Sequence, residues 1–187
     1  LFKKRKKFNF DFIFHRQINF INKDLWRDKV ILDIGCRTLT FTNYFIASGA
    51  KECVSADVSF ESIKLGLSKK VSYILGKRIL MDTTTPNIKC IVGDCQDLGF
   101  LKNRSFIDIV YIADCLHHFS NKNLFFERLN CILKNNASII IIEPNGSHVL
   151  RKLANFFGHR LGFLSPDEKA LRISELKKTI QANNFEI

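Results

Sequence analysis

The sequence predicts an α/β domain in which a doubly wound parallel sheet carries helices on both faces, and two observations predict it. The first is a set of short apolar runs with little period-two alternation, which is typical of strands covered on both faces. These runs are Val30–Ile34, Glu52–Ala56, Ile88–Val92, Ile107–Ile112 and Ser138–Ile142. The second is that helix-like segments separate the runs. An alternation of strand and helix with right-handed crossovers places helices on both faces of a parallel sheet.

The segments between and after these strands are predicted to be helical. Thr40–Ala47 follows the first strand directly. Ser59 can cap the next helix, because a serine oxygen accepts a hydrogen bond from the first turn. Asn121–Leu133 has its apolar residues on one side, and Ser165 with Pro166 is typical of the start of a last helix.

The segment Gly66–Asn87 is long for a single helix and its exit. Gly76 and the TTTPN turn indicate a second short helix followed by a loop. We therefore expect this segment to elaborate the crossover between the second and third strands.

The chain has 187 residues, of which 46% are hydrophobic, and this is enough for one domain with a buried core. We divide it into a basic and aromatic N-terminal segment, residues 1–27, and a single domain, residues 28–187. The last residues, Phe185–Ile187, are expected to begin an edge strand. The C-terminal edge of the domain is accordingly expected to be incomplete.

The net charge of the chain is +11, and its densest basic run is KKRKK at Lys3–Lys7. Such a charge is compatible with a nucleic-acid or anionic-membrane partner. A biased composition, rich in Lys, Asn, Ile and Phe, explains the scattered basic residues better. A nucleic-acid partner is therefore not favoured.

Six cysteines show no C-x-x-C pair and no spacing typical of zinc ligands, so no metal site is predicted. They are Cys36, Cys53, Cys90, Cys95, Cys115 and Cys131. Most lie in or beside apolar runs and are interpreted as small core residues in a reducing compartment, which favours the cytoplasm. No apolar run approaches the roughly 20 residues that a membrane span needs.

An acidic residue stands at or directly after each of the five predicted strands, although the chain has only 18 acidic residues. They are Asp33, Asp57, Asp94, Asp114 and Glu143. In an open α/β sheet, ligands bind outside the carboxyl ends of the strands, so these carboxylates suit a ligand with hydroxyl and amino groups. Helix capping explains one or two of them singly but explains all five less well.

The spacing between Gly35 and Asp57 is 22 residues. An acid about 20 residues after the glycine turn holds the ribose hydroxyls in nucleotide-binding α/β domains. The dinucleotide pattern G-x-G-x-x-G is absent, because residues 35–40 are GCRTLT. This lowers the expectation of a dehydrogenase.

The chain resembles the class I S-adenosylmethionine-dependent methyltransferases, in particular the small-molecule branch that includes quinone-biosynthesis enzymes. The matching stretches are ILDIGCRT, SADVSFESI, IVGDCQDLGF, IDIVYIADCLHHFSN and LNCILKNNASIIIIEPN, followed by SPDEKALRISELKKTIQANNFEI. They occur in the family's order and cover residues 28–187. The resemblance implies a Rossmann-like sheet with strand order 3-2-1-4-5, S-adenosylmethionine as cofactor and a small-molecule methyl acceptor.

The resemblance also implies a role for each matching position. The residues that would contact the cofactor are Asp33, Gly35, Cys36, Arg37, Asp57, Val58, Asp94, Cys95, Ala113 and Asp114. Gly35 and its neighbours would line the methionine part, and Asp57 would hold the ribose hydroxyls. Val58 and Asp94 would meet the adenine, and Asp114 would lie on the sulfonium side.

The chain departs from the family where the glycine loop usually reads G-x-G-x-G, because Arg37 and Leu39 replace the second and third glycines. A non-glycine residue in a left-handed conformation costs on the order of 1–2 kcal/mol. Arg37 offers a compensation, since its guanidinium can pair with the cofactor carboxylate. A second departure, Asn135 and Asn136 at a usual Gly-Gly turn, is mild because asparagine tolerates left-handed conformations.

His117 and His118 follow the fourth strand at the expected mouth of the site. Histidine titrates near neutral pH, so either residue can be a general base or a substrate contact. The alternative is that one ring packs in the fold and the other faces solvent.

Two other functions stay open. The altered loop and the positive charge are compatible with a degenerate, non-catalytic binding module. RNA methylation is less favoured, because the chain reads IADC where an NPPY-like tetrapeptide would be expected.

Overall fold

The structure is a computed structural model that describes residues 21–68, 71–74, 77–80, 86–101, 105–143 and 171–187. The basic run Lys3–Lys7 and the predicted helix start at Ser165 and Pro166 lie outside the described residues. None of the helices in the described ranges is long and apolar enough to cross a membrane.

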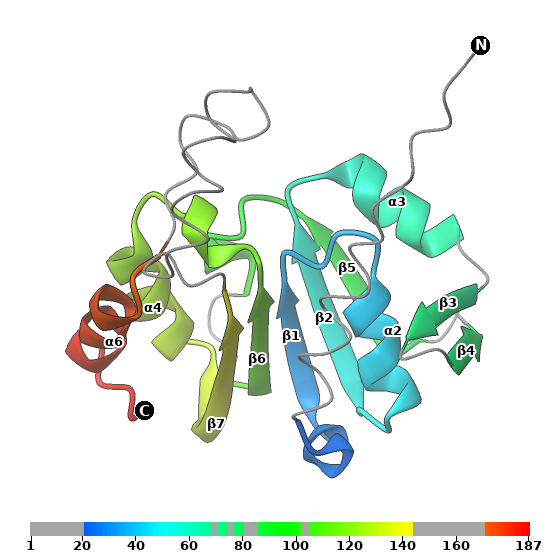
Figure 1. The fold of residues 1–187 in the computed structure, drawn as a ribbon, viewed down its shortest axis with the longest axis horizontal. Coiled ribbons are helices and arrows are strands. Elements are labelled where there is room, and N and C mark those ends of the chain that lie inside the picture. The colour runs from blue at the N-terminus through cyan, green and yellow to red at the C-terminus, as the bar shows by residue number, and fades with distance from the viewer. Residues whose placement is uncertain (1–20, 69–70, 75–76, 81–85, 102–104, 144–170) are drawn as a thin grey trace.

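A five-stranded parallel sheet forms the centre of the molecule (Figure 1). Its strands are β1 (Val30–Ile34), β2 (Glu52–Asp57), β5 (Ile88–Val92), β6 (Ile107–Ala113) and β7 (Leu133–Ile142). The spatial order is β5-β2-β1-β6-β7, and every pairing in this sheet is parallel. This confirms the predicted order 3-2-1-4-5 and the predicted fold class.

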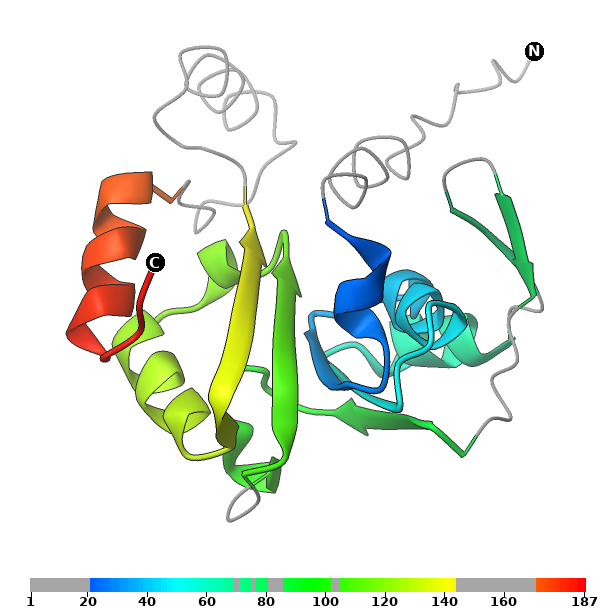
Figure 2. The ribbon, with the colours of Figure 1, turned by 90° about the horizontal axis from the view of Figure 1, so that it is seen from below.

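The helices lie on both faces of the sheet (Figure 2). They are α2 (Thr40–Ala47), α3 (Phe60–Ser68), α4 (Lys122–Asn130) and α6 (Ile173–Ala182), with 3-10 turns η1 (Lys23–Trp26), η2 (Leu98–Leu101) and η3 (Leu116–His118). Side chains of α2 join one buried cluster, whereas side chains of α4 and α6 pack in another. Along β1, residues 30, 32 and 34 face the α4 cluster while residue 31 faces the α2 cluster, so one strand supplies both cores.

The predicted cap at Ser59 is present, and the structure adds a cap at Asn121. The Ser59 hydroxyl oxygen accepts a hydrogen bond from the Ser62 N–H at 3.1 Å, and the side-chain oxygen Oδ1 of Asn121 accepts one from the Leu124 N–H at 3.0 Å. The helix that follows Asn121 ends at Asn130, earlier than predicted. Leu133 starts β7 instead and pairs with β6, because strand pairing satisfies its backbone while its side chain stays buried.

The prediction of a second short helix within Gly66–Asn87 is wrong. After α3 the chain forms an antiparallel hairpin of β3 (Val71–Ile74) and β4 (Lys77–Leu80). The VSYI sequence of β3 consists mainly of residues that favour strands, and β3 satisfies its backbone by pairing with β4.

The predicted edge strand at Phe185–Ile187 is also absent, and these residues lie in no strand or helix. Asn184 adopts a left-handed conformation, with φ of 63°, directly after α6. The N–H groups of Asn184 and Phe185 donate to the carbonyls of Gln181 and Ile180, which is the Schellman pattern of a helix end. Phe185 then packs against the core, so the backbone turns away from strand pairing.

Candidate active site

The sequence-predicted site residues come together at the carboxyl ends of the parallel strands, the upper edge of the sheet in Figure 1. The loops after β1, β2, β5, β6 and β7 all emerge there, because parallel strands end on the same side. Loops after neighbouring strands can therefore contact one another.

Gly35 directly follows β1 and must be glycine for two reasons. Its φ is +72°, and an added Cβ would lie 2.6 Å from Sγ of Cys115 in the loop after β6. The N–H groups of Gly35 and Cys36 both donate to the carbonyl oxygen of Ala56, at 2.9 and 3.2 Å. The first loop is thus held against the end of β2 and packed against the loop after β6.

Arg37 and Leu39, which replace the family's other glycines, both keep the left-handed conformation, with φ of 47° and 58°. The backbone N–H of Arg37 donates to Oδ2 of Asp57 at 2.8 Å. The second oxygen of this carboxylate accepts the Ser59 N–H at 2.8 Å. The glycine-type turn therefore persists without its glycines, and Asp57 stabilises it through a backbone contact.

Leu39 is fully buried, and a glycine in another element makes room for it. A Cβ on Gly66 of α3 would lie 2.7 Å from the carbonyl group of Thr38 and 2.9 Å from Cγ of Leu39. Ile63 and Cys36 complete the apolar surroundings of Leu39. Sequence reasoning found no compensation for Leu39; the LGL sequence inside a predicted helix was the available signal.

Asp33 lies beneath the loop rather than at the surface. Its side chain is 2% exposed and accepts a hydrogen bond from the Thr42 hydroxyl at 2.6 Å. The Thr42 hydroxyl also lies 2.8 Å from the Ser55 hydroxyl. Burial raises the pKa of Asp33 to about 7, and the nearby Asp57 adds to the rise. Asp33 thus joins a buried polar cluster between β1, β2 and α2.

The end of β2 presents one carboxylate and several exposed apolar side chains. Asp57 is largely buried, whereas Val58, Phe60 and Val92 are exposed. Asp94 is exposed and accepts the Gln96 N–H at 2.9 Å. Val58 and Asp94 were predicted site residues, whereas Phe60 and Val92 were missed because both were assigned only to secondary structure.

Two cysteines of the predicted site are buried. Burial raises the pKa of the Cys95 thiol to about 11, and burial raises that of Cys36 further. Both thiols therefore stay protonated at neutral pH and contribute shape rather than charge. Ala113 and Asp114 are half-buried at the end of β6, where Asp114 has a φ of 51° and donates its N–H to the Ile142 carbonyl at 2.9 Å.

His117 and His118 lie in the 3-10 turn after β6, and they differ in exposure. His117 is buried and His118 is exposed, with ring centroids 4.0 Å apart. Nδ1 of His117 lies 2.7 Å from Oε2 of Glu143, which follows β7. Asp114, His117 and Glu143 each offer a ligand atom, and these atoms all lie within 4.8 Å of one another.

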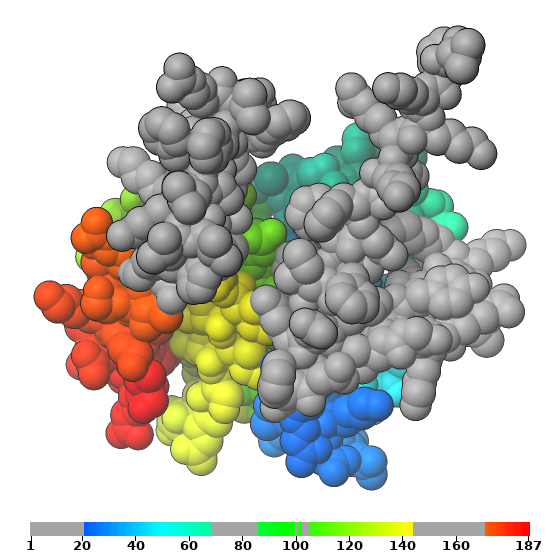
Figure 3. Space-filling view, viewed as in Figure 1, coloured from blue at the N-terminus to red at the C-terminus, as the bar shows by residue number. Residues whose placement is uncertain are grey.

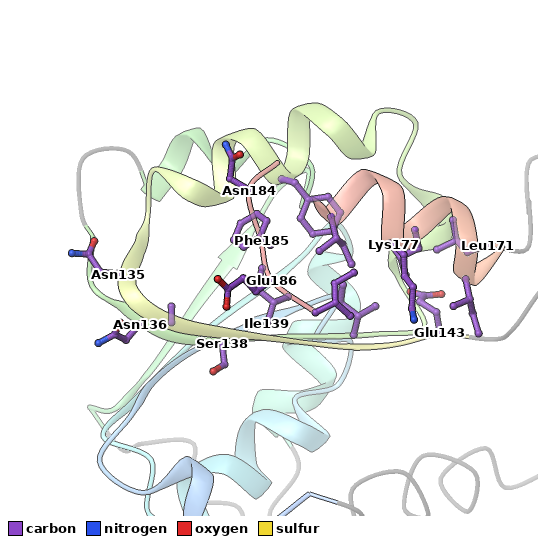
Figure 4. Close-up of a pocket in the computed structure, with 17 residues that line it drawn as sticks. Asn135, Asn136, Ser138, Ile139, Glu143, Leu171, Lys177, Asn184, Phe185 and Glu186 are labelled. Atoms are coloured by element: carbon purple, nitrogen blue, oxygen red, sulfur yellow. The ribbon is translucent and has the colours of Figure 1, made fainter. Parts of the chain in front are cut away.

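A groove of about 980 Å³ runs between β7 and α6, with Glu143 at one end (Figure 4). Asn135 and Asn136 lie at its other end, and Lys177 of α6 also lines it. In the space-filling view the yellow surface of β7 lies beside the orange and red surface of α6 (Figure 3). The groove therefore follows the side of the sheet and meets the site at Glu143.

A family model described as a methyltransferase domain matches residues 32–141, which spans β1 to β7 and every predicted site residue. The chain belongs to this methyltransferase family. It is a class I domain, and its cofactor is S-adenosylmethionine.

Curated and solved relatives agree with this assignment. Protein arginine N-methyltransferase 1 of Saccharomyces cerevisiae is 30% identical over 171 residues, which cover 87% of this chain and 47% of the relative. A SAM-dependent methyltransferase from Archaeoglobus fulgidus superposes with a TM-score of 0.69 at 16% identity, covering 94% of this chain and 69% of that one. The latter likeness concerns the fold alone. The methyltransferase chain spans about half, or less, of the length of the curated relatives it matches.

The methyltransferase site fits this cofactor. The close approach at Gly35 leaves backbone rather than a side chain facing the loop after β6. Asp57 retains acceptor capacity for hydroxyl groups, because each carboxylate oxygen has two lone pairs and accepts one backbone N–H, from Arg37 or from Ser59. Val58, Phe60 and Val92 offer apolar surface for a planar base.

Proposed function

We propose that this domain transfers a methyl group from S-adenosylmethionine to a small-molecule acceptor. The observation that carries the proposal is the Asp57 carboxylate, which holds the turn containing Arg37 in its left-handed form. A domain that had lost its cofactor would have no need to keep two strained residues in this turn. The preserved turn therefore also speaks against the non-catalytic binding module.

The cofactor supplies a methyl group already activated as a sulfonium, so the chain mainly binds, aligns and excludes water. In our proposal Asp57 holds the ribose hydroxyls, and Val58 with Asp94 receives the adenine. Gly35 and Arg37 face the methionine part, and Arg37 is exposed on the turn with its guanidinium available for a carboxylate.

We propose His117 or His118 as the group that accepts a proton when the acceptor must lose one. Both lie in one short turn at the end of β6, beside the half-buried Asp114. Exposed His118 reaches solvent, whereas buried His117 is held by Glu143.

The yeast arginine methyltransferase raises a second acceptor class, a protein arginine. A guanidinium is best bound by carboxylates that accept two parallel hydrogen bonds. Asp114 and Glu143 lie close to each other, but Oε1 of Glu143 already accepts the backbone N–H groups of Cys115 and Leu116, so it has no lone pair left for one of the two parallel bonds. This observation favours the small molecule over the arginine side chain.

Calorimetric titration with S-adenosylmethionine and with its demethylated product tests the proposal. We expect both to bind, and the methyl transfer to small phenolic or quinol acceptors to exceed that to an arginine-rich peptide or to RNA. Failure of both ligands to bind would favour the non-catalytic module. All six cysteines are free thiols, which supports our proposal of a reducing, cytoplasmic compartment.

A further inference from the structure

One carboxylate from the end of β7 holds three consecutive residues of the loop after β6. The side chain of Glu143 is 5% exposed. Its Oε1 accepts the backbone N–H of Cys115 at 2.8 Å and also that of Leu116. Its Oε2 lies 2.7 Å from Nδ1 of His117. Neighbouring strands are thereby joined beyond the end of their backbone ladder.

The loop that Glu143 holds packs directly against the turn after β1. It begins at Asp114, a non-glycine residue with φ of 51°, whose N–H donates to Ile142. The next side chain, Cys115, packs against Gly35 so closely that a Cβ there would lie 2.6 Å from its sulfur. A shift of Cys115 would therefore displace the turn after β1.

We infer that Glu143 is a positioning residue of this site: it keeps Cys115 against Gly35 and fixes the proton of His117 on Nδ1. The inference rests on the proposed function only for its effect on cofactor binding. The position of the proton follows from the contacts themselves.

The chemistry of the carboxylate dictates which histidine nitrogen carries the proton. An ionised carboxylate only accepts hydrogen bonds, so the 2.7 Å contact requires that Nδ1 of His117 donates. Neutral His117 is then the Nδ1–H tautomer. In this way Glu143 acts on the chemistry of the site through His117 without itself contacting the reacting atoms.

A divalent cation on Asp114, His117 and Glu143 is the competing explanation of this cluster. Such an ion would need a lone pair on Nδ1 of His117 and on Oε2 of Glu143. The short contact between these two atoms uses the nitrogen as a donor instead. The geometry therefore favours a positioning role, and cation binding is an outcome of the test.

The decisive variant is Glu143→Gln, which keeps the shape and removes the charge. Its amide oxygen stays on the two backbone N–H groups, because the amide NH₂ would oppose them donor to donor. The NH₂ then faces His117 and moves the proton from Nδ1 to Nε2. Nitrogen-15 spectra of the histidine rings in the whole chain report the tautomer. We expect Nδ1–H in the unaltered protein, Nε2–H in the variant, and affinity for S-adenosylmethionine lowered about two- to tenfold.

Asp108→Asn is the matched control. Asp108, on β6 near its other end, accepts the Val30 N–H at 2.9 Å and pairs with Lys134 Nζ at 2.8 Å. It too joins neighbouring strands through a backbone contact, but it lies away from the site. We expect this variant to change neither the His117 tautomer nor the cofactor affinity.

Three results would overturn the inference. One is an Nε2–H tautomer of His117 in the unaltered protein, a measurement that stays decisive even where Glu143→Gln does not fold. Another is the same loss of affinity in Asp108→Asn. The third is broadening of the His117 resonances by micromolar Mn²⁺ in the unaltered protein that is absent in Glu143→Gln. A protein that binds no cofactor but shows the Nδ1–H tautomer would refute the proposed function alone.

Discussion

Gly66 of α3 offers the sharpest test of how the altered cofactor turn is tolerated. Glycine inside a helix normally weakens it, and replacement by alanine stabilises an exposed helix by about 1 kcal/mol. Here the added Cβ would lie 2.7 Å from the Thr38 carbonyl and 2.9 Å from Cγ of Leu39. The first of these neighbours is backbone, which cannot move aside as a flexible side chain can.

We expect Gly66→Ala to lower the free energy of unfolding by about 1–2 kcal/mol, because overpacking costs about 1–3 kcal/mol and exceeds the gain in helix propensity. The displaced turn should also weaken the binding of S-adenosylmethionine. The cost should shrink in a Leu39→Ala background, where the contact with Cγ is gone but the contact with Thr38 remains.

Urea unfolding and calorimetric titration of the two single variants and the double variant measure both effects. Gly93→Ala is the control for stability, since a Cβ at that position would meet nothing within 4 Å. If Gly66→Ala stabilises the protein as an unconstrained helix position would, the packing of Leu39 against α3 does not explain how the turn is tolerated.

Other predictions concern single groups of the site. Asp57→Ala should weaken S-adenosylmethionine binding by about 1–3 kcal/mol, and unchanged affinity in a titration would disprove our placement of the ribose. If the Arg37 guanidinium holds the cofactor carboxylate, Arg37→Gly should lower the affinity for S-adenosylmethionine, and high salt should lower the affinity of the unaltered protein. Tighter binding by the variant would show that relief of backbone strain dominates. Burial raises the folded-state pKa of Asp33 to about 7 from its ordinary value of 3.8, so its contribution to stability is present at low pH and is lost as the pH rises from about 4 to about 7. In Asp33→Asn the free energy of unfolding should fall by up to about 4 kcal/mol less across that pH range than in the unaltered protein. Urea unfolding of both proteins at several pH values measures the difference.

The sheet could be predicted from the sequence because its determinants are local. Strands covered on both faces leave continuous apolar runs, and the predicted bounds of the first and third runs match β1 and β5. The cap at Ser59 follows from side-chain chemistry within one turn. Each of these features is decided by residues a few positions apart.

The missed features depend on contacts between distant residues. The hairpin after α3 forms only when β3 and β4 pair, and Leu133 leaves the helical pattern because β6 lies beside it. Gly66 and Leu39 are joined only by the packing of α3 on the turn after β1. The sequence alone does not show that these residues lie close together in space.

The site is built from two carboxylates that each hold the backbone of a neighbouring loop. Asp57 accepts the Arg37 N–H and so holds the turn after β1, whereas Glu143 accepts the Cys115 N–H and holds the loop after β6. The two loops meet where Gly35 contacts Cys115. Because a hydrogen bond to a charged acceptor is stronger than a neutral one, the pair can offset the strain of non-glycine residues in left-handed conformations. The turn can therefore lose two glycines and keep its shape, provided that both carboxylates and Gly35 remain.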